Sequence, residues 1–187
     1  LMLIFLAQRR LACGVGIAAC LGLLFTFAAC HWIGERIAAR CEGWLQTGRS
    51  ELASGDALLA LDQLGRALRE PACGAAEDAG TWFAYAEARA RIPAPELGHL
   101  VGAVRALRTA QRLEPRNEGV AVALAEALLA ARRHEEALAT ATRILEFRPA
   151  SKPARRIVAG ALLAAGRSRE LRTHLDEDGW VEDGFWF

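Results

Sequence analysis

The sequence has very little lysine: Lys152 is accompanied by 22 arginines, and these 23 basic residues are balanced by 22 acidic ones. The resulting net charge of +1 excludes a general nucleic-acid binder, which would carry a clear basic excess. Charged residues make up 24% of the chain and apolar residues 53%, a composition that excludes intrinsic disorder. The 187 residues leave room for one ordinary domain and one additional element.

Sequence motifs for catalysis, cofactors and metals are also missing. There is no Gly-x-Ser-x-Gly, Walker or Cys-x-x-Cys pattern, and no histidine stands in a His-Glu-x-x-His motif or at zinc-binding spacing from a cysteine. The pair Gly14-x-Gly16 lies inside an apolar run rather than after a strand, which excludes a phosphate-binding loop. We therefore expect a protein that is not an enzyme and binds neither cofactor nor metal.

Formal charge is absent from residues 11–33, LACGVGIAACLGLLFTFAACHWI. These 23 residues exceed the about 20 apolar residues that cross a bilayer core as a helix. Trp32 at the end of the run, with Arg36 shortly after it, is typical of a membrane interface. The sequence therefore predicts a basic tail at residues 1–10, a transmembrane helix at 11–33 that contacts the lipid bilayer, and a juxtamembrane link at 34–40.

The direction of insertion follows from the basic residues on either side of this run. Arg9 and Arg10 favour a cytoplasmic N-terminus, whereas Arg36 and Arg40 oppose it. A short basic tail before a first apolar helix resembles a signal anchor, so we expect the repeat region described below on the periplasmic side. Phe27-Ala28-Ala29-Cys30 also resembles the lipobox of bacterial lipoproteins, and a lipid-anchored periplasmic protein with acylated Cys30 is the alternative.

Small residues recur at every fourth position of the same run, at Gly14, Ala18, Gly22 and Thr26. This spacing places them along one stripe of a helix, where they allow a second helix to approach closely within the bilayer. The stripe therefore predicts a contact with another membrane-embedded subunit.

A repeat of 34 residues follows the apolar run. Pro115 and Pro149 are 34 positions apart, and the stretches before them, 103–115 and 137–149, share one layout of small and large apolar residues. This layout resembles the tetratricopeptide repeat, a family built from pairs of helices. The resemblance covers residues 41–175 and implies an all-α fold, with an α-solenoid of about four helix hairpins after the transmembrane helix.

Each unit matches the family at positions where helices pack. The matches of the four units are Trp44, Gly48, Ala60, Leu64 and Ala67; Trp82, Tyr85, Ala86, Ala103, Leu107 and Ala110; Leu124, Ala125, Leu128 and Ala137; and Val158, Ala159, Leu162 and Leu171. The second unit is about five residues too long, between Ile92 and Glu96. Predicted helix starts are Asp56, Asn117 and Ser151, which all cap helices well, and turns are predicted at Gly55 and Gly166.

The family resemblance also implies an inner groove lined by the first helix of each unit. Its lining would be Leu45, Arg49, Phe83, Glu87, Val122, Glu126 and Arg156. This set lacks the ordered Lys, Asn and Arg side chains with which some relatives hold the terminal carboxylate of a peptide. Chaperone-type peptide binding is therefore not expected.

Two cysteines lie at the two ends of the first predicted hairpin. An antiparallel hairpin brings Cys41 and Cys73 close together, so a disulfide between them is predicted for an oxidising compartment. Two free thiols are the alternative.

The C-terminal tail, residues 176–187, is acidic and aromatic. It contains five acidic residues and no basic one, together with Trp180, Phe185, Trp186 and Phe187. Because aromatic residues dominate protein contacts, the tail is predicted either to cap the last repeat or to dock on a partner.

Together these features predict a membrane-anchored scaffold that binds other protein subunits without catalysis and without nucleic acid. We expect an accessory or assembly subunit of a bacterial envelope membrane complex. A regulatory subunit of a membrane enzyme is a second alternative.

Overall fold

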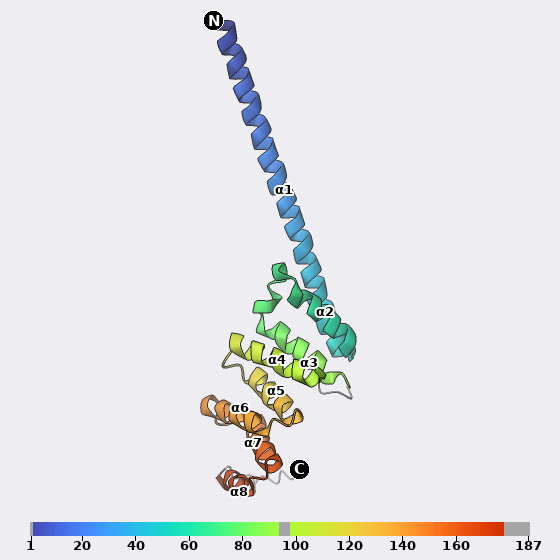
Figure 1. The fold of residues 1–187 in the computed structure, drawn as a ribbon, viewed down its shortest axis with the longest axis vertical. Coiled ribbons are helices and arrows are strands. Elements are labelled where there is room, and N and C mark those ends of the chain that lie inside the picture. Colours follow the sequence, from blue (N-terminus) through green and yellow to red (C-terminus); the bar gives the residue numbers. More distant parts are fainter. Residues whose placement is uncertain (1, 94–97, 178–187) are drawn as a thin grey trace. The chain divides into compact units, whose positions relative to one another are not determined.

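The computed structural model describes the backbone of residues 2–93 and 98–177 and the side chains of residues 25–93 and 98–175. Within these residues all regular structure is helical, with eight α-helices and two short 3-10 helices (Figure 1). The chain divides into two units, Leu1–Gly43 and Trp44–Phe187, which are described separately.

The first unit consists of the N-terminal part of α1 (Met2–Ser54). The predicted link at 34–40 is helical, because its alanine, arginine and isoleucine residues include no proline that would end the helix. Near this link the Arg36 guanidinium lies 4.4 Å from the ring centre of Trp32, and His31 lies 3.6 Å from Glu35.

The predicted membrane span falls largely outside the described side chains. Among the described residues, no helix has the length and apolarity needed to cross a bilayer. Residues 11–24 of the predicted span, including Gly14, Ala18 and Gly22 of the small-residue stripe, lie outside the described side chains, whereas Thr26 is described and exposed.

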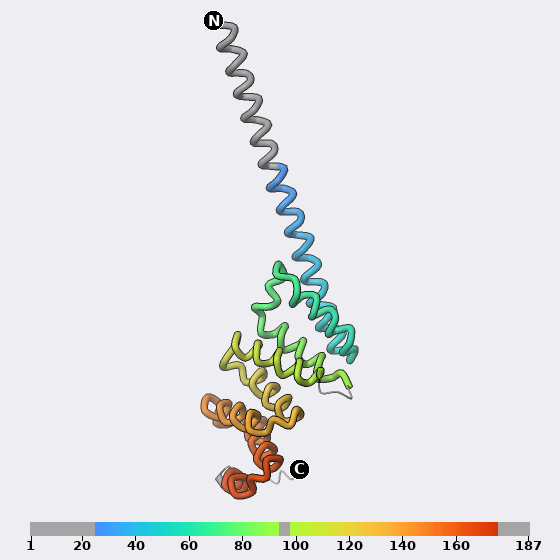
Figure 2. The backbone as a smooth tube through the Cα atoms, in the orientation of Figure 1, coloured from blue at the N-terminus to red at the C-terminus, as the bar shows by residue number. Residues whose placement is uncertain are grey.

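The second unit is a stack of antiparallel helices in which each helix packs on the next (Figure 2). Its first hairpin joins the last turns of α1 to α2. The further elements are α2 (Ala57–Arg69), η1 (Pro71–Cys73), η2 (Ala75–Glu77), α3 (Ala79–Arg91), α4 (Gly98–Leu113), α5 (Glu118–Ala130), α6 (His134–Phe147), α7 (Lys152–Ala164) and α8 (Ser168–Glu177). Helix α5 also contacts α7, the equivalent helix of the following hairpin.

The predicted helix starts are confirmed by their hydrogen bonds. Asp56 accepts from the backbone N–H of Leu59 at 2.9 Å, and Asn117 accepts from that of Val120 at 3.2 Å. Ser151 in turn accepts from the N–H of Ala154 at 3.4 Å. These side chains satisfy donors that the first turn of a helix leaves without a partner.

Small residues allow the helices of the second unit to cross closely. A Cβ atom added to Gly48 would lie 2.7 Å from Cγ of Leu64, so α1 and α2 can approach as they do only because position 48 has no side chain. Ala103, Ala137 and Ala141 are fully buried in the same way, while Leu124 fills the space between helices. Apart from Ala141, these residues are among the positions that resemble the tetratricopeptide repeat.

The segment between the first two hairpins is ordered rather than irregular. Gly74 has a φ of 61°, a left-handed conformation that separates η1 from η2 and that glycine adopts without strain. The indole N–H of Trp82 donates to the carbonyl of Ala76 at 2.9 Å and fixes η2 against α3.

Helix α8 continues to Glu177, so it includes the first two residues of the predicted acidic tail. The tail aromatics Trp180, Phe185, Trp186 and Phe187 lie outside the described residues.

Candidate functional site: an apolar groove between three helices

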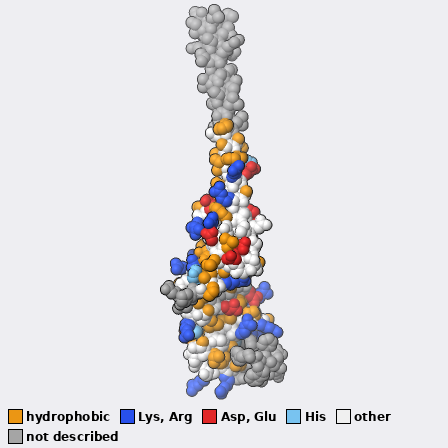
Figure 3. Space-filling view, turned by 90° about the vertical axis from the view of Figure 1, so that its right-hand side faces the viewer, with side chains coloured by type: hydrophobic (Ala, Val, Ile, Leu, Met, Phe, Trp, Pro, Cys, Tyr) orange, Lys and Arg blue, Asp and Glu red, His pale blue; other side chains and the backbone are white. Residues whose placement is uncertain are grey.

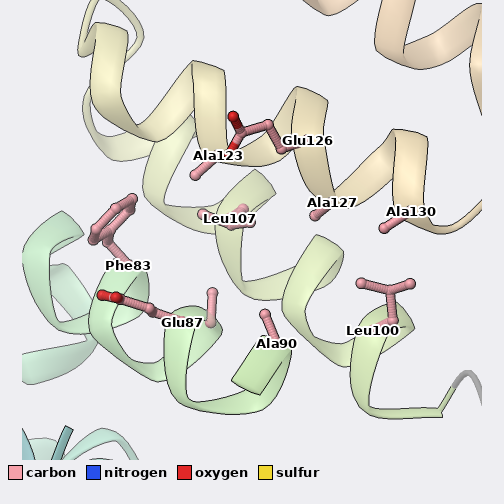
Figure 4. A pocket seen from close by; sticks show the side chains of 10 residues that line it. Phe83, Glu87, Ala90, Leu100, Leu107, Ala123, Glu126, Ala127 and Ala130 are labelled. Atoms are coloured by element: carbon pink, nitrogen blue, oxygen red, sulfur yellow. The ribbon is translucent and has the colours of Figure 1, made fainter. Parts of the chain in front are cut away.

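A groove with a volume of about 400 Å³ lies between α3, α4 and α5. Its lining consists of Phe83, Ala86, Glu87 and Ala90 from α3, Leu100 and Leu107 from α4, and Ala123, Glu126, Ala127 and Ala130 from α5. Figure 4 shows Leu107 near the centre, Phe83 and Glu87 towards one end, and Leu100 and Ala130 towards the other.

The shape of the groove results from the alternation of large and small residues. Small alanines contribute to it from α3 and α5, and the larger Phe83, Leu100 and Leu107 complete its apolar lining. Such a surface can take up apolar side chains of a ligand, because burial of apolar area is the main driving force of association.

Three of the seven groove residues predicted from the sequence line this groove, namely Phe83, Glu87 and Glu126. The other four lie outside it. Leu45 packs on the buried cluster of Leu52, Ala60 and Leu64, and Val122 packs on the clusters around Ala125 and Ala121. Arg49 and Arg156 instead form ion pairs, with Asp78 at 3.6 Å and with Glu126 at 3.9 Å.

The sequence prediction missed the contribution of α4. Leu100 and Leu107 belong to the second helix of their hairpin, and the prediction considered first helices only. Their spacing of seven residues places them two turns apart on one face of α4, and this spacing is the signal that could have identified them.

The two carboxylates of the groove have arginine partners that do not line it. Glu87 accepts from Arg91 at 2.5 Å, and Nη1 of Arg91 also donates to the carbonyl of Leu52 at 2.6 Å. Glu126 pairs with Arg156 at 3.9 Å, and both side chains are more than half exposed. An exposed pair at this distance contributes little to stability.

Helix α3, which contributes four lining residues, is held at its start by Asp78. The Asp78 carboxylate accepts from the Thr81 hydroxyl at 2.6 Å and from the backbone N–H groups of Thr81 and Gly80 at 2.9 and 3.2 Å. The hydrogen bond from the Thr81 side chain is the largest cause of a lowered pKa of Asp78, with smaller contributions from the two N–H groups and the nearby Arg49.

Among the described residues no group of three or more His, Cys, Asp or Glu side chains could hold a metal ion. Cys30 is an exposed free thiol, whereas Cys41 and Cys73 are disulfide-bonded cysteines. The pairing of Cys41 with Cys73 stays a prediction.

This helical array is similar to known proteins in sequence and in structure. The family model for the tetratricopeptide repeat matches residues 96–160. A crystal structure of MamA has a TM-score of 0.61 at 14% identity, covering 76% of this chain and 81% of MamA. The Arabidopsis OM64 TPR domain has a TM-score of 0.55 at 18% identity, covering 66% of this chain and 95% of that domain.

A third similar structure contains a bound peptide. The first TPR of Spaghetti (RPAP3), bound to the HSP90 peptide SRMEEVD, has a TM-score of 0.55 at 18% identity, covering 69% of this chain and 98% of that chain. The search of curated proteins finds no match. At these identities the structural likeness shows the fold, and the family match extends the resemblance to the tetratricopeptide repeat in sequence over residues 96–160.

Proposed function

We propose that this protein is a membrane-anchored, non-catalytic scaffold that binds other protein subunits. In this proposal it is an accessory or assembly subunit of a bacterial envelope membrane complex, with its repeats on the periplasmic side. The apolar groove between α3, α4 and α5 is the observation that carries the binding function, because a walled apolar surface of this kind gains free energy when a partner covers it.

The peptide-bound neighbour supports protein binding as the class of function. The TPR of Spaghetti binds the HSP90 peptide SRMEEVD, which has acidic residues near its C-terminus. Glu87 and Glu126 are the charged residues that line the groove of the present chain, so its ligand would differ from that acidic peptide.

The membrane anchor is supported by the composition of residues 11–33 and by the described end of this segment. Phe25, Phe27, Trp32 and Ile33 are exposed large apolar side chains, with Phe25 exposed to 77%. Figure 3 shows apolar side chains predominating in the first described stretch of α1, with charged ones beyond it. A bilayer would cover this apolar surface, and Trp32 beside Arg36 would lie at its interface.

Two further contacts belong to the proposal. The stripe Gly14, Ala18, Gly22 and Thr26 would pack on a transmembrane helix of the partner. The aromatic residues Trp180, Phe185, Trp186 and Phe187 would either cap the last repeat or enter the partner.

The proposal is tested by crosslinking the protein at its native level in membranes, purifying it in mild detergent and identifying the crosslinked proteins by mass spectrometry. We expect a small, stoichiometric set of membrane subunits, lost when Ala130→Arg places a charge at the exposed end of the groove. A lone monomer or homodimer without crosslinked partners would contradict the scaffold function. A partner set that forms an enzyme, with activity that changes on removal of this chain, would favour the regulatory subunit.

The form of the anchor is tested by the intact mass and by carbonate extraction of membranes. A transmembrane helix predicts an unmodified chain that resists extraction, and the Cys30→Ala variant should behave in the same way. A chain that begins at Cys30 with added acyl groups, and that leaves the membrane in the Cys30→Ala variant, would instead identify the lipoprotein.

A further inference from the structure

The charged side chains of the groove indicate the chemistry of its ligand. Ten residues line the groove, eight of them apolar, and the remaining two are the carboxylates Glu87 and Glu126. They are 39 positions apart, the 34-residue repeat plus the five-residue excess of the second unit, and therefore occupy equivalent positions on α3 and α5. The groove thus repeats one feature in two hairpins, an acidic side chain beside an apolar wall.

The arginines that pair with the groove carboxylates, and Arg49 near the start of α3, have partners of their own. Arg91 is bound to the Leu52 carbonyl and to Glu87, and Arg49 pairs with Asp78. Arg156 approaches Glu126 only to 3.9 Å, and both of these side chains remain largely exposed. Glu126 is therefore the carboxylate that a ligand can reach with the least competition.

We propose that the groove takes a segment of a partner protein that combines apolar side chains with lysine or arginine. This inference rests on the proposed scaffold function and specifies the chemistry of the partner. The apolar side chains enter between Phe83, Leu100 and Leu107, and a basic side chain reaches Glu126 and the remaining acceptor capacity of Glu87.

Charge also decides against the chain's own C-terminal tail as the occupant. The tail is aromatic, which suits an apolar groove, but Asp178, Glu182 and Asp183 would be brought towards Glu87 and Glu126. Like charges at an interface disfavour a wrong partner.

The inference is tested by selecting peptides from a randomised display library on the full-length protein in detergent micelles. The counter-selection target is the Ala130→Trp variant, because Ala130 is exposed at one end of the groove and a tryptophan there would fill it. We expect the selected peptides to be rich in apolar and basic residues and poor in acidic ones.

The best peptide is then synthesised in three versions, with its basic positions kept, replaced by glutamine or replaced by glutamate. We expect affinity to fall about fivefold from the basic to the glutamine version and further for the glutamate version, with smaller differences at high salt. The Glu87→Gln/Glu126→Gln variant should bind the basic peptide only as well as the glutamine version. Glu146→Gln, an exposed change on α6, is the matched control and should have no effect.

The Arg156→Ala variant distinguishes a direct contact between Glu126 and the peptide from a purely structural role of Glu126. A purely structural role predicts no change in peptide affinity when Arg156 is removed. Removing this competitor should strengthen binding of the basic peptide by about twofold. Selected peptides rich in acidic residues, or equal affinity of the three versions, would overturn the inference, while loss of binding in Ala130→Trp would still support the groove. Binding unaffected by Ala130→Trp, or no enrichment at all, would contradict the proposed groove itself.

Discussion

Arg132 and Gly166 occupy the same place in two successive hairpins, 34 residues apart, and have φ angles of 58° and 72°. Glycine adopts this left-handed conformation without strain, whereas a residue with a side chain clashes with its own backbone. The same turn position is thus occupied by the favourable glycine in one hairpin and by an unfavourable residue in the other. At Arg132 the unfavourable residue stands in the turn between α5 and α6, where its N–H donates to the carbonyl of Leu129.

The variant Arg132→Gly is expected to be more stable than the wild type by about 1 kcal/mol, because it removes this strain. Urea unfolding followed by circular dichroism measures the difference. Arg148→Gly is the control: its φ of −139° is open to any residue, so the change should not stabilise the protein. Equal effects of the two substitutions would contradict the explanation by strain.

Asp78 gives a prediction that depends on pH. The variant Asp78→Ala should lose about 1 kcal/mol at neutral pH, because three donors at the start of α3 lose their acceptor. The folded-state pKa lies below the ordinary value of 3.8, so this contribution is fully present above about pH 3.8 and is lost as the pH falls through the folded pKa. Unfolding of wild type and variant at several pH values should show their difference shrinking in acid; a difference that is constant or grows there would exclude the capping carboxylate as its source.

At the scale of helices, the sequence predicts best what depends on local chemistry. Asp56, Asn117 and Ser151 could be recognised as caps because a cap needs only its own side chain and the next turn. Seven of the ten groove residues escaped prediction, and two of them, Leu100 and Leu107, line it because of how α4 sits against two other helices. The 34-residue spacing predicts the hairpins, but it does not determine which side chains from different hairpins meet.

The crossing of α1 and α2 provides a prediction at this scale. Gly48→Ala is expected to destabilise the protein by about 1–3 kcal/mol, because the new methyl group would lie 2.7 Å from Cγ of Leu64. Gly43→Ala is the matched control in the same helix. Nothing lies within 4 Å of its added Cβ, so it should stabilise by up to about 1 kcal/mol through helix propensity. Thermal unfolding of both variants provides the measurement; similar shifts in Tm would contradict the role of the crossing.

At the scale of the whole molecule, the cysteines bear on the stability of the chain. Cys30 is free, and Cys41 and Cys73 are disulfide-bonded. A bond between Cys41 and Cys73 would close a loop of 33 residues. Such a bond restricts the conformations of the unfolded chain. Disulfides form and persist in oxidising compartments, in agreement with the proposed periplasmic location.

We expect the intact mass of the non-reduced full-length protein to be lower by two hydrogens than that of the reduced protein, and a tryptic peptide to contain Cys41 joined to Cys73. The Cys41→Ser/Cys73→Ser variant should lose about 3–4 kcal/mol of stability, from the loop-closure entropy of the unfolded chain. Cys30→Ser is the control and should leave both mass difference and stability unchanged. Recovery of Cys41 and Cys73 as unmodified thiols would refute the bond.

Helix α8 contacts mainly α7 among the described helices, and none of its residues 168–175 is buried. A stack in which each hairpin is coupled only to its neighbours behaves as a one-dimensional lattice, and such a lattice melts from its weaker end. The rate of amide hydrogen exchange should therefore be highest in α8 and decrease towards α4 and α5. The terminal hairpin should open locally under conditions in which the rest of the protein stays folded. The groove would then retain its shape while the end of the array frays, and a partner bound at that end could alter its rigidity without touching the groove.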